Sequence, residues 1–378
     1  MVIEQRIMNL DEAWKTVSRD KDFEEEKAQL VIITASKKLL QNRKLLQDII
    51  HHYPNAAIVS TSTAGEIAQA RVKENSLVLT ALSFEHTELK TSILKVGDHK
   101  NSEDLGSTLA RELNSENLKH ILIFSDGQFV NGTTLVDGIT KAVDPEVIIS
   151  GGLAGDGIDF NETWVGLNKD LAPGNVVGIG FYSDRLKVHT SARGGWQEFA
   201  QCRVITKAEG NTVYEIDGQN ALGLYKRYLG PKAKQLPGSA LLFPLSMKSG
   251  DDPALVRTIL SINEKDQSLN FAGMMPEGAT VKLMRTRLED LIDAAEEATD
   301  IIQEQQKDHD FVFIVSCVGR KLVLEHRTDE EITMVADTLA GTPVIAGYYS
   351  YGEISTEMER KSCELYNQTL TLTSYKEI

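Results

Sequence analysis

The sequence predicts a mixed α/β (α+β) fold with two related domains, whose mixed β-sheets are flanked by helices. Three stretches share one pattern: an apolar strand, a turn of small residues and glycine, and then Gly-Glu or Gly-Asp. Another apolar strand, ending in a small polar residue, precedes each stretch by about one helix. The chain therefore contains three strand–helix–strand units, built from residues 30–36 with 58–66, 121–125 with 148–156, and 311–316 with 345–353.

The composition is typical of a globular cytoplasmic protein. The 378 residues include 40 Lys and Arg against 55 Asp and Glu, a formal net charge of -15. This charge argues against broad binding to nucleic acids or anionic membranes, which needs clustered cations. Residues 1–20 have no apolar core and are not a secretory signal. The three cysteines are far apart and odd in number, which argues against a disulfide framework and favours a reducing compartment.

The chain is expected to divide into a lead-in and two domains. Residues 1–28 are rich in charge and are predicted to be helical. The first domain then covers residues 29–217 and the second covers residues 218–378. The boundary is placed at Asp217-Gly218, a turn signal between a hairpin and a helix.

The elements of the first domain follow from apolar, β-branched runs that alternate with helical segments. Beyond the strands of the units, this domain is predicted to contain helices at 37–52, 102–113 and 133–143, strands at 76–84, 89–96 and 163–167, and a hairpin of 202–206 with 212–216.

A second hairpin is predicted to join residues 175–182 to residues 185–191 through a turn at 183–184. Side chains alternate between the two faces of a strand. Alternation along the second arm puts Lys187, His189 and Ser191 on one face, and Leu186, Val188 and Thr190 on the other.

The second domain begins with a helix, 220–229, that Gly230-Pro231 brings to an end. A long helix, 288–307, leads into the third strand–helix–strand unit. The remaining predicted strands of this domain are 240–246, 255–263, 268–271, 281–285 and 368–374.

The glycine-rich stretch 151–157 suggests a phosphate-binding turn. It lacks the spacing G-x-G-x-x-G, and residues 158–167 look extended, whereas a phosphate-binding turn opens a helix. A nucleotide site is therefore disfavoured.

Two residues could serve a hydrolase or transferase. Cys317 ends a strand near Arg320, a setting that favours a thiolate, but a buried free cysteine behaves as a small hydrophobe. Asp126, in the sequence Ser-Asp-Gly, is more typical of a turn or helix cap than of an acid catalyst. An enzymatic role is the least favoured interpretation.

His189 stands apart from the other histidines, which are scattered and lack the spacing of a zinc site. It shares a strand face with Lys187 and precedes Arg193 and Trp196. One imidazole, a nearby cation and apolar surroundings can hold a porphyrin through an axial bond and its propionates. A hydrogen-bonded strand histidine would look the same, and spacing alone favours that simpler interpretation.

The turns of the three units offer a different candidate site. Glu66, Asp156 and Glu353 stand at strand ends, and Tyr348 and Tyr351 flank the last of them. Convergent polar groups with aromatic walls suit a small polar ligand. Solvated turn acids and a tyrosine-rich domain interface would have the same sequence, so both interpretations stay open.

Several of these motifs resemble FIST-domain proteins, in the order expected for that family and over nearly the whole chain from about residue 25. Residues 313–320, 347–354 and 365–369 resemble the FIST C-terminal domain, and residues 60–67, 125–127 and 151–156 resemble the FIST N-terminal domain.

The resemblance implies a bacterial sensory input module without catalytic activity, which binds a small ligand and regulates a separate signalling partner such as a histidine kinase. Chains of this make-up also resemble the nitric-oxide-sensing haem proteins of the family, which bind b-type haem through a histidine. On that resemblance His189 would be the axial ligand, and haem b would be non-covalent because the chain lacks C-x-x-C-H.

Two functions therefore remain open. The first is a haem-based nitric oxide sensor with a site at His189, Arg193 and Trp196. The second is a haem-free module for a small, amino-acid-like polar metabolite at the strand-end turns. Either could form a homo-oligomer.

Overall fold

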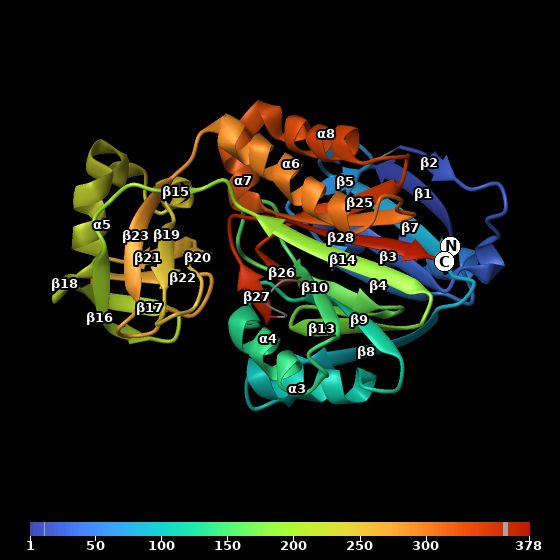
Figure 1. The fold of residues 1–378 in the computed structure, drawn as a ribbon, viewed down its shortest axis with the longest axis horizontal. Coiled ribbons are helices and arrows are strands. Elements are labelled where there is room, and N and C mark those ends of the chain that lie inside the picture. Colours follow the sequence, from blue (N-terminus) through green and yellow to red (C-terminus); the bar gives the residue numbers. More distant parts are fainter. Residues whose placement is uncertain (11, 358–361) are drawn as a thin grey trace.

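Three mixed β-sheets, each built around one parallel pair of strands, form the larger of the two lobes in Figure 1. This computed structural model describes residues 1–10, 12–357 and 362–378. The architecture is the mixed α/β class expected from the sequence, with helices on the outer faces of the sheets. The three predicted strand–helix–strand units are confirmed, because each one supplies the parallel pair of one sheet.

In the first unit, β3 (Leu30–Ala35) pairs in parallel with β4 (Ala57–Ser62) and antiparallel with β7 (Ser76–Ser83), which also pairs with β1 (Val2–Asn9). The other elements of this unit are β2 (Lys15–Arg19), a 3-10 turn (Glu25–Lys27), α1 (Lys37–Leu40), α2 (Arg43–His52), β5 (Glu66–Ala68) and β6 (Arg71–Lys73).

The second unit repeats this topology. β9 (Leu118–Ser125) pairs in parallel with β10 (Ile148–Leu153) and antiparallel with β13 (Asn175–Tyr182), which also pairs with β8 (Glu88–Lys95). The other elements are a 3-10 turn (Val96–Asp98), α3 (Ser102–Leu113), α4 (Gly132–Thr140), β11 (Val165–Leu167) and β12 (Asp170–Ala172).

The third unit follows the same order. β24 (Phe311–Cys317) pairs in parallel with β25 (Val344–Ser350) and antiparallel with β28 (Leu370–Glu377), which also pairs with β14 (Leu186–Arg193). The other elements are α6 (Leu288–Gln305), α7 (Val318–Leu324), a 3-10 turn (Glu325–Arg327), α8 (Thr328–Thr338), β26 (Gly352–Glu357) and β27 (Ser362–Tyr366).

The three units exchange strands in a cycle. The strand that follows the turn of each unit leaves its own sheet and adds, antiparallel, to the sheet of another unit. β5 pairs with β25, β26 pairs with β10, and β11 pairs with β4. Each of the three turns is therefore a crossing point between two sheets.

The inner faces of the sheets share one apolar core. Ile32, Phe124 and Phe313, from the central strands of the three units, all belong to it, and the rings of Phe124 and Phe313 meet edge to face at 5.8 Å. The central strands are almost continuously apolar because both of their faces are covered. In Figure 1, α6, α7 and α8 lie above the three sheets of the larger lobe, and α3 and α4 lie below them.

The smaller lobe is inserted between β14 and α6, and it has a hydrophobic core of its own that includes Val213, Leu222 and Phe271. Its elements are β15 (Gln197–Glu198), β16 (Arg203–Glu209), β17 (Thr212–Ile216), β18 (Gln219–Asn220), α5 (Ala221–Leu229), 3-10 turns (Gly230–Gln235 and Gly238–Leu242), β19 (Leu245–Lys248), β20 (Leu255–Arg257), β21 (Ile259–Asn263), β22 (Ser268–Phe271) and β23 (Thr280–Arg285).

Polar contacts dock the smaller lobe on the larger one. The guanidinium of Arg257 is fully buried and donates to the carbonyl of Leu365 at 3.0 Å, and burial lowers the pKa of Arg257 to about 10. The Asn131 amide donates to the side-chain oxygen of Asn211 at 2.9 Å. Residue 217, at the predicted domain boundary, lies inside this lobe between β17 and β18.

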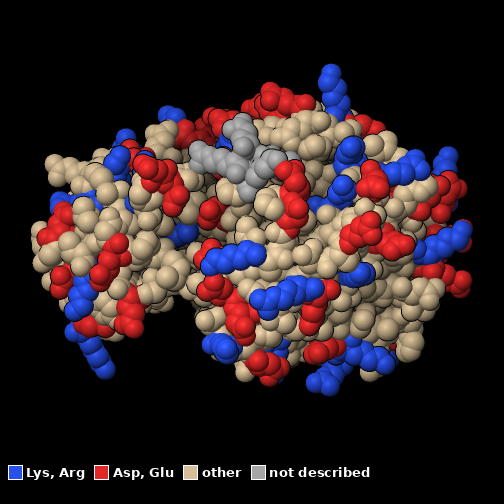
Figure 2. Space-filling view, turned by 60° about the horizontal axis from the view of Figure 1, so that its bottom comes forward, with Lys and Arg blue, Asp and Glu red and all other residues tan. Residues whose placement is uncertain are grey.

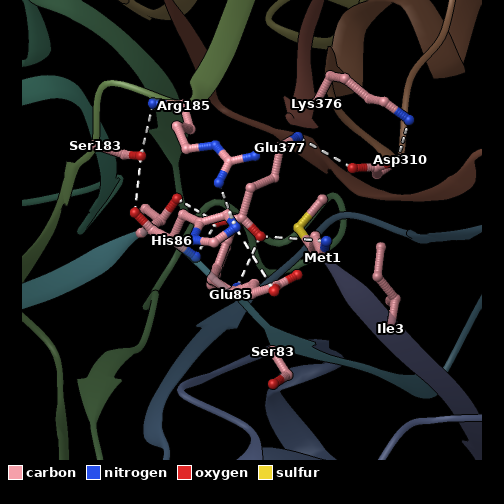
Figure 3. Close-up of polar contacts among 12 residues, drawn as sticks. Met1, Ile3, Ser83, Glu85, His86, Ser183, Arg185, Asp310, Lys376 and Glu377 are labelled. Atoms are coloured by element: carbon pink, nitrogen blue, oxygen red, sulfur yellow. Dashed lines mark hydrogen bonds and ion pairs between the residues drawn. The ribbon is translucent and has the colours of Figure 1, made fainter.

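The two ends of the described chain meet beside β1 and β28 (Figure 3). The α-amino group of Met1 lies 3.2 Å from a carboxylate oxygen of Glu377, and both groups are shielded from solvent. The same carboxylate accepts hydrogen bonds from the backbone N–H groups of Glu85 and His86 and from the hydroxyl of Thr87. One carboxylate at the end of β28 thus binds the amino terminus before β1 and the loop between β7 and β8.

Two predictions about local structure are wrong. The helix predicted over residues 1–28 is the strand pair β1–β2, because β1 pairs with β7 along its whole length and buries Ile3 and Ile7. The hairpin predicted over residues 175–191 does not form. Both of its arms are strands, but β13 pairs with β8 and β9, whereas β14 crosses to the third sheet.

Two further elements are shorter than predicted. The helix over residues 37–52 is broken in two, because Asn42 caps α2 by accepting from the N–H of Leu45. The strand over residues 240–246 begins as a 3-10 turn and becomes β19 only at Leu245. The predicted helices at 102–113, 220–229 and 288–307 are confirmed to within about two residues at their ends.

Candidate functional site

The three turns that carry the candidate carboxylates converge in space. Backbone hydrogen bonds join the first turn to the other two: Gly155 donates to the carbonyl of Ser62 at 3.0 Å, and Ala64 donates to the carbonyl of Tyr349 at 2.8 Å. This convergence follows from the strand exchange, because each turn is where the chain passes from one sheet to another.

Asp156 and Tyr351 join the second turn to the third. The Tyr351 hydroxyl donates to one oxygen of Asp156, and Lys37 lies 3.2 Å from the other. Asn161 and Glu162 donate their backbone N–H groups to that second oxygen. Burial alone would raise the pKa of Asp156, but these donors outweigh it and lower the pKa below its usual value.

Glu66 is buried and its partners lie within the first unit. Its carboxylate accepts from the hydroxyl of Thr63 at 2.5 Å, and from the hydroxyl and backbone N–H of Ser76 at 2.7 and 3.1 Å. Burial raises the pKa of Glu66 to about 7.

Glu353 is buried in the same way. It accepts from the hydroxyls of Ser350 and Thr369 at 2.6 and 2.8 Å, and burial raises its pKa to about 8. Tyr348 is also fully buried, and its ring packs against Phe124. Its hydroxyl finds no hydrogen-bond partner among the described residues.

The five predicted turn residues therefore lie near the convergence of the turns, but the three carboxylates among them have separate sets of donors. Glu66, Asp156 and Glu353 each close a turn of the chain that holds them, as carboxylates at strand ends commonly do. Tyr351 links two of the turns and Tyr348 fills the core. These contacts account for the three carboxylates and Tyr351 without a ligand, whereas the Tyr348 hydroxyl has no hydrogen-bond partner among the described residues.

His189 lies on the face of β14 that α6 covers, together with Ser191, whose hydroxyl donates to the carbonyl of Ala298 on that helix. Its ring is half-buried, and its Nδ1 lies 2.8 Å from the amide oxygen of Gln305. Burial, with a smaller effect of Lys187, lowers the pKa of His189. A neutral imidazole whose Nδ1 is held by an acceptor presents Nε2 as a ligand atom.

Arg193 and Trp196 have different surroundings. Arg193 is exposed on the same face of β14 as His189, four residues further along. The Trp196 indole N–H donates to the carbonyl of Gln368 at 3.0 Å, and its ring packs against Leu291 and Ile292 where the chain crosses to the smaller lobe. The Arg193 guanidinium lies 3.8 Å from a carboxylate oxygen of Glu297, and Trp196 supports the crossing between the lobes.

A cleft of about 240 Å³ lies near His189, between the two lobes. On the face shown in Figure 2, acidic and basic side chains are interspersed over both lobes. One wall of the cleft is the edge of β14 from Thr190 to Arg193, and a second wall is Leu255 of the smaller lobe. Ile301 and Gln305 at the end of α6 also line it, so the amide that holds His189 is part of the cleft wall.

Sequence reasoning missed this cleft. Its walls come from residues about 60 to 170 positions apart, and no local motif marks Leu255 or Gln305. The sequence signals that pointed toward the cleft were His189, which lies beside the cleft, and Arg193, which lines it.

Cys317 and Asp126 are placed as structural residues. Cys317 is buried, and burial raises the pKa of its thiol well above the usual range, which disfavours the thiolate. The Asp126 carboxylate accepts from the backbone N–H groups of Phe129 and Gly174 and from the hydroxyl of Thr163. It holds a turn together, as the sequence indicates.

No helix among the described residues is both long and apolar enough to cross a membrane.

Comparison with known protein families gives two matches that together span most of the chain. Residues 29–219 match the FIST N domain and residues 221–356 match the FIST C domain. A search of curated proteins found no match.

Proposed function

The chain belongs to the FIST-domain family, and on that basis we propose that it binds a small polar ligand in the cleft between its lobes and reports the binding to a separate signalling protein. FIST domains are associated with sensory modules of signal transduction that bind small ligands. A histidine kinase is the kind of partner that such an input module regulates.

The observation that carries this proposal is that both lobes contribute walls to one cleft. A ligand that touches Arg193 and Gln305 on one side and Leu255 on the other would lose contacts if the lobes moved apart. Such a ligand shifts the equilibrium between arrangements by its difference in affinity for them. The signalling partner would then bind one position of the smaller lobe more tightly than another.

The lining of the cleft favours a small polar ligand that carries both charges, such as an amino acid, because Arg193 and Glu357 both line it. The Arg193 guanidinium can pair with a carboxylate in two-point geometry, and Gln305 and Thr356 offer further polar groups. Ile301 and Leu255 supply apolar contact. A volume of about 240 Å³ suits a molecule of amino-acid size.

Thermal unfolding in the presence of amino acids and short dicarboxylic acids tests this. A ligand at a hundredfold excess over its dissociation constant adds about 2.7 kcal/mol of stability. The stabilisation should disappear in Arg193→Ala and Gln305→Ala and persist in Arg287→Ala, an exposed arginine outside the cleft wall. A stabilising compound that acts equally on all of these variants would contradict the cleft as its site.

A b-type haem held by His189 is the second candidate, and the contact of Nδ1 with Gln305 favours it. The axial bond would form at Nε2, and Arg193 would pair with a propionate. Haem in this position would supply an iron atom that binds nitric oxide. His189 would hold the iron beside the cleft and Gln305 would position the imidazole, so ligand binding there would act on the same lobe contacts.

The absorption spectrum of the protein, produced with a haem precursor and compared with the pyridine haemochrome, tests this candidate. We expect one haem per chain, lost in His189→Ala and retained in His51→Ala, an exposed histidine on α2. A protein that takes up no haemin, or that binds it equally after His189→Ala, would leave the haem-free sensor as the better explanation.

A further inference from the structure

A second groove, remote in sequence from the cleft, lies between α2 and the β11–β12 hairpin. Its volume is about 280 Å³. The hairpin is anchored against β4 at its turn, where Asn168 exchanges hydrogen bonds with the backbone of Ile58 at 2.7 and 3.0 Å. The groove therefore has two fixed walls, and it shares no lining residue with the cleft between the lobes.

The floor of the groove is apolar. Leu40 and Leu46 are buried beneath it, and Ile50, Trp164 and Leu171 are only partly covered. The Trp164 indole N–H donates to Glu162 at 2.8 Å, which fixes the ring as one side of the groove. An apolar molecule in the groove would cover these side chains.

The polar rim is basic. Arg43 and Lys169 line the groove from opposite walls, and neither forms an ion pair with any described residue. The part of the chain described here places no Asp or Glu in the lining.

The start of α2 adds to the positive potential. Arg43 is the first residue of this ten-residue helix, and Asn42 caps the N–H of Leu45 only. The remaining N–H groups of the first turn carry the positive end of the helix dipole and favour an anion at this end of the groove.

We propose that this groove binds a small anion with an apolar body, a medium-chain or aromatic carboxylate. The carboxylate would lie between Arg43 and Lys169, and the apolar body would lie against Trp164, Ile50 and Leu171. Arg43 and Lys169 would repel a cationic ligand. A fully polar anion would leave the apolar floor of the groove exposed to water, so an anion with an apolar body fits the groove best.

Octanoate is the probe, and Trp164 fluorescence and titration calorimetry are the measurements. We expect saturable binding in the intact chain and about tenfold weaker binding in each of Arg43→Gln and Lys169→Gln, the effect of one charge-assisted contact. Lys44→Gln is the matched control, since Lys44 is exposed next to Arg43 but does not line the groove. Trp164→Phe should remove the fluorescence change and leave a calorimetric signal.

Two further arms decide the outcome. Octylammonium should bind at least tenfold more weakly than octanoate, and so should butyrate, which lacks most of the apolar body.

Gln47→Trp, which fills the groove from α2, should abolish octanoate binding. Binding that is equal in Lys44→Gln, Arg43→Gln and Gln47→Trp, or equal for octanoate and octylammonium, would overturn the proposal. Cleft variants such as Gln305→Ala should leave octanoate binding unchanged, so this result is separate from that of the sensory proposal.

Discussion

Arg320 and Glu331 form an ion pair in which neither side chain is accessible to solvent, with a guanidinium nitrogen 2.5 Å from a carboxylate oxygen. The same guanidinium donates to the carbonyls of Gly194 and Leu291, at 2.5 and 2.9 Å. Gly194 is where the chain leaves β14 for the smaller lobe, and Leu291 is where α6 returns from it. One arginine thus holds both crossings between the lobes.

Removing one member of this pair should strongly destabilise the protein. Glu331→Gln leaves the Arg320 charge buried without a counter-ion, which costs about 3–5 kcal/mol in the free energy of unfolding. Urea unfolding measures the change. Glu330→Gln, which breaks an exposed pair with Arg327, should leave the midpoint nearly unchanged, and equal effects of the two substitutions would contradict the assignment.

Glu353 should make stability fall as the pH rises. Burial raises the pKa of Glu353 to about 8 in the folded protein, above its value in the unfolded chain, so its contribution is complete below about pH 4.3 and is lost toward pH 8. Glu353→Gln cannot ionise and should gain stability relative to the unchanged protein between pH 5 and pH 9. Unfolding curves across that range, with the exposed Glu264→Gln as control, test this; parallel curves would refute the raised pKa.

Glu377 should have the opposite dependence. Burial alone would raise its pKa, but the N–H donors, the Thr87 hydroxyl and the Met1 amino group lower it below the usual value. Its contribution is therefore present above the unfolded pKa and lost as the pH falls through the folded one. Glu377→Gln should cost on the order of 2 kcal/mol at pH 7. The difference from the unchanged protein should shrink on acidification, and a constant difference would argue against the ion pair.

The contact between α3 and α4 should not tolerate a methyl group. A Cβ on Gly106 would collide with the carbonyl oxygen of Leu135, and one on Gly138 would collide with that of Glu103. Gly106→Ala should destabilise by about 1–3 kcal/mol through overpacking, although alanine is the better helix former. Gly97→Ala, where a Cβ meets nothing within 4 Å, is the control for thermal unfolding. A stabilised Gly106→Ala would show that the helices can move apart.

Much of the fold could be predicted from the sequence because its signals are local. The three apolar strand pairs and helices such as α3 and α6 stand out by periodicity and by their end signals. Alternation also places His189 and Ser191 on one face of β14, as predicted. The sequence could not predict that β13 and β14 belong to different sheets. Two strands joined by a short turn at 183–184 have the same sequence pattern whether or not they pair with each other.

The sites were harder to predict than the fold. The recurring Gly-acid turns indicated a ligand site, but Glu66 and Glu353 are satisfied by nearby hydroxyls together with Ser76 and Thr369, which lie ten and sixteen residues away. The groove on α2 depends on Arg43 and Lys169, which are far apart in sequence. The separation of two residues in the sequence does not predict whether their side chains line the same groove.

The exchange of β5, β11 and β26 has a consequence for how the chain acquires its structure. None of the three units can complete its sheet from its own residues, because each one takes up a strand pair from one unit and contributes a strand pair to another. A nascent chain released after the second unit could pair β4 with β3 and β11, yet it would leave β5 without its partner β25 and β10 without β26. Assembly of the lobe therefore awaits synthesis of the third unit, and fragments cut at the unit boundaries should need one another to fold.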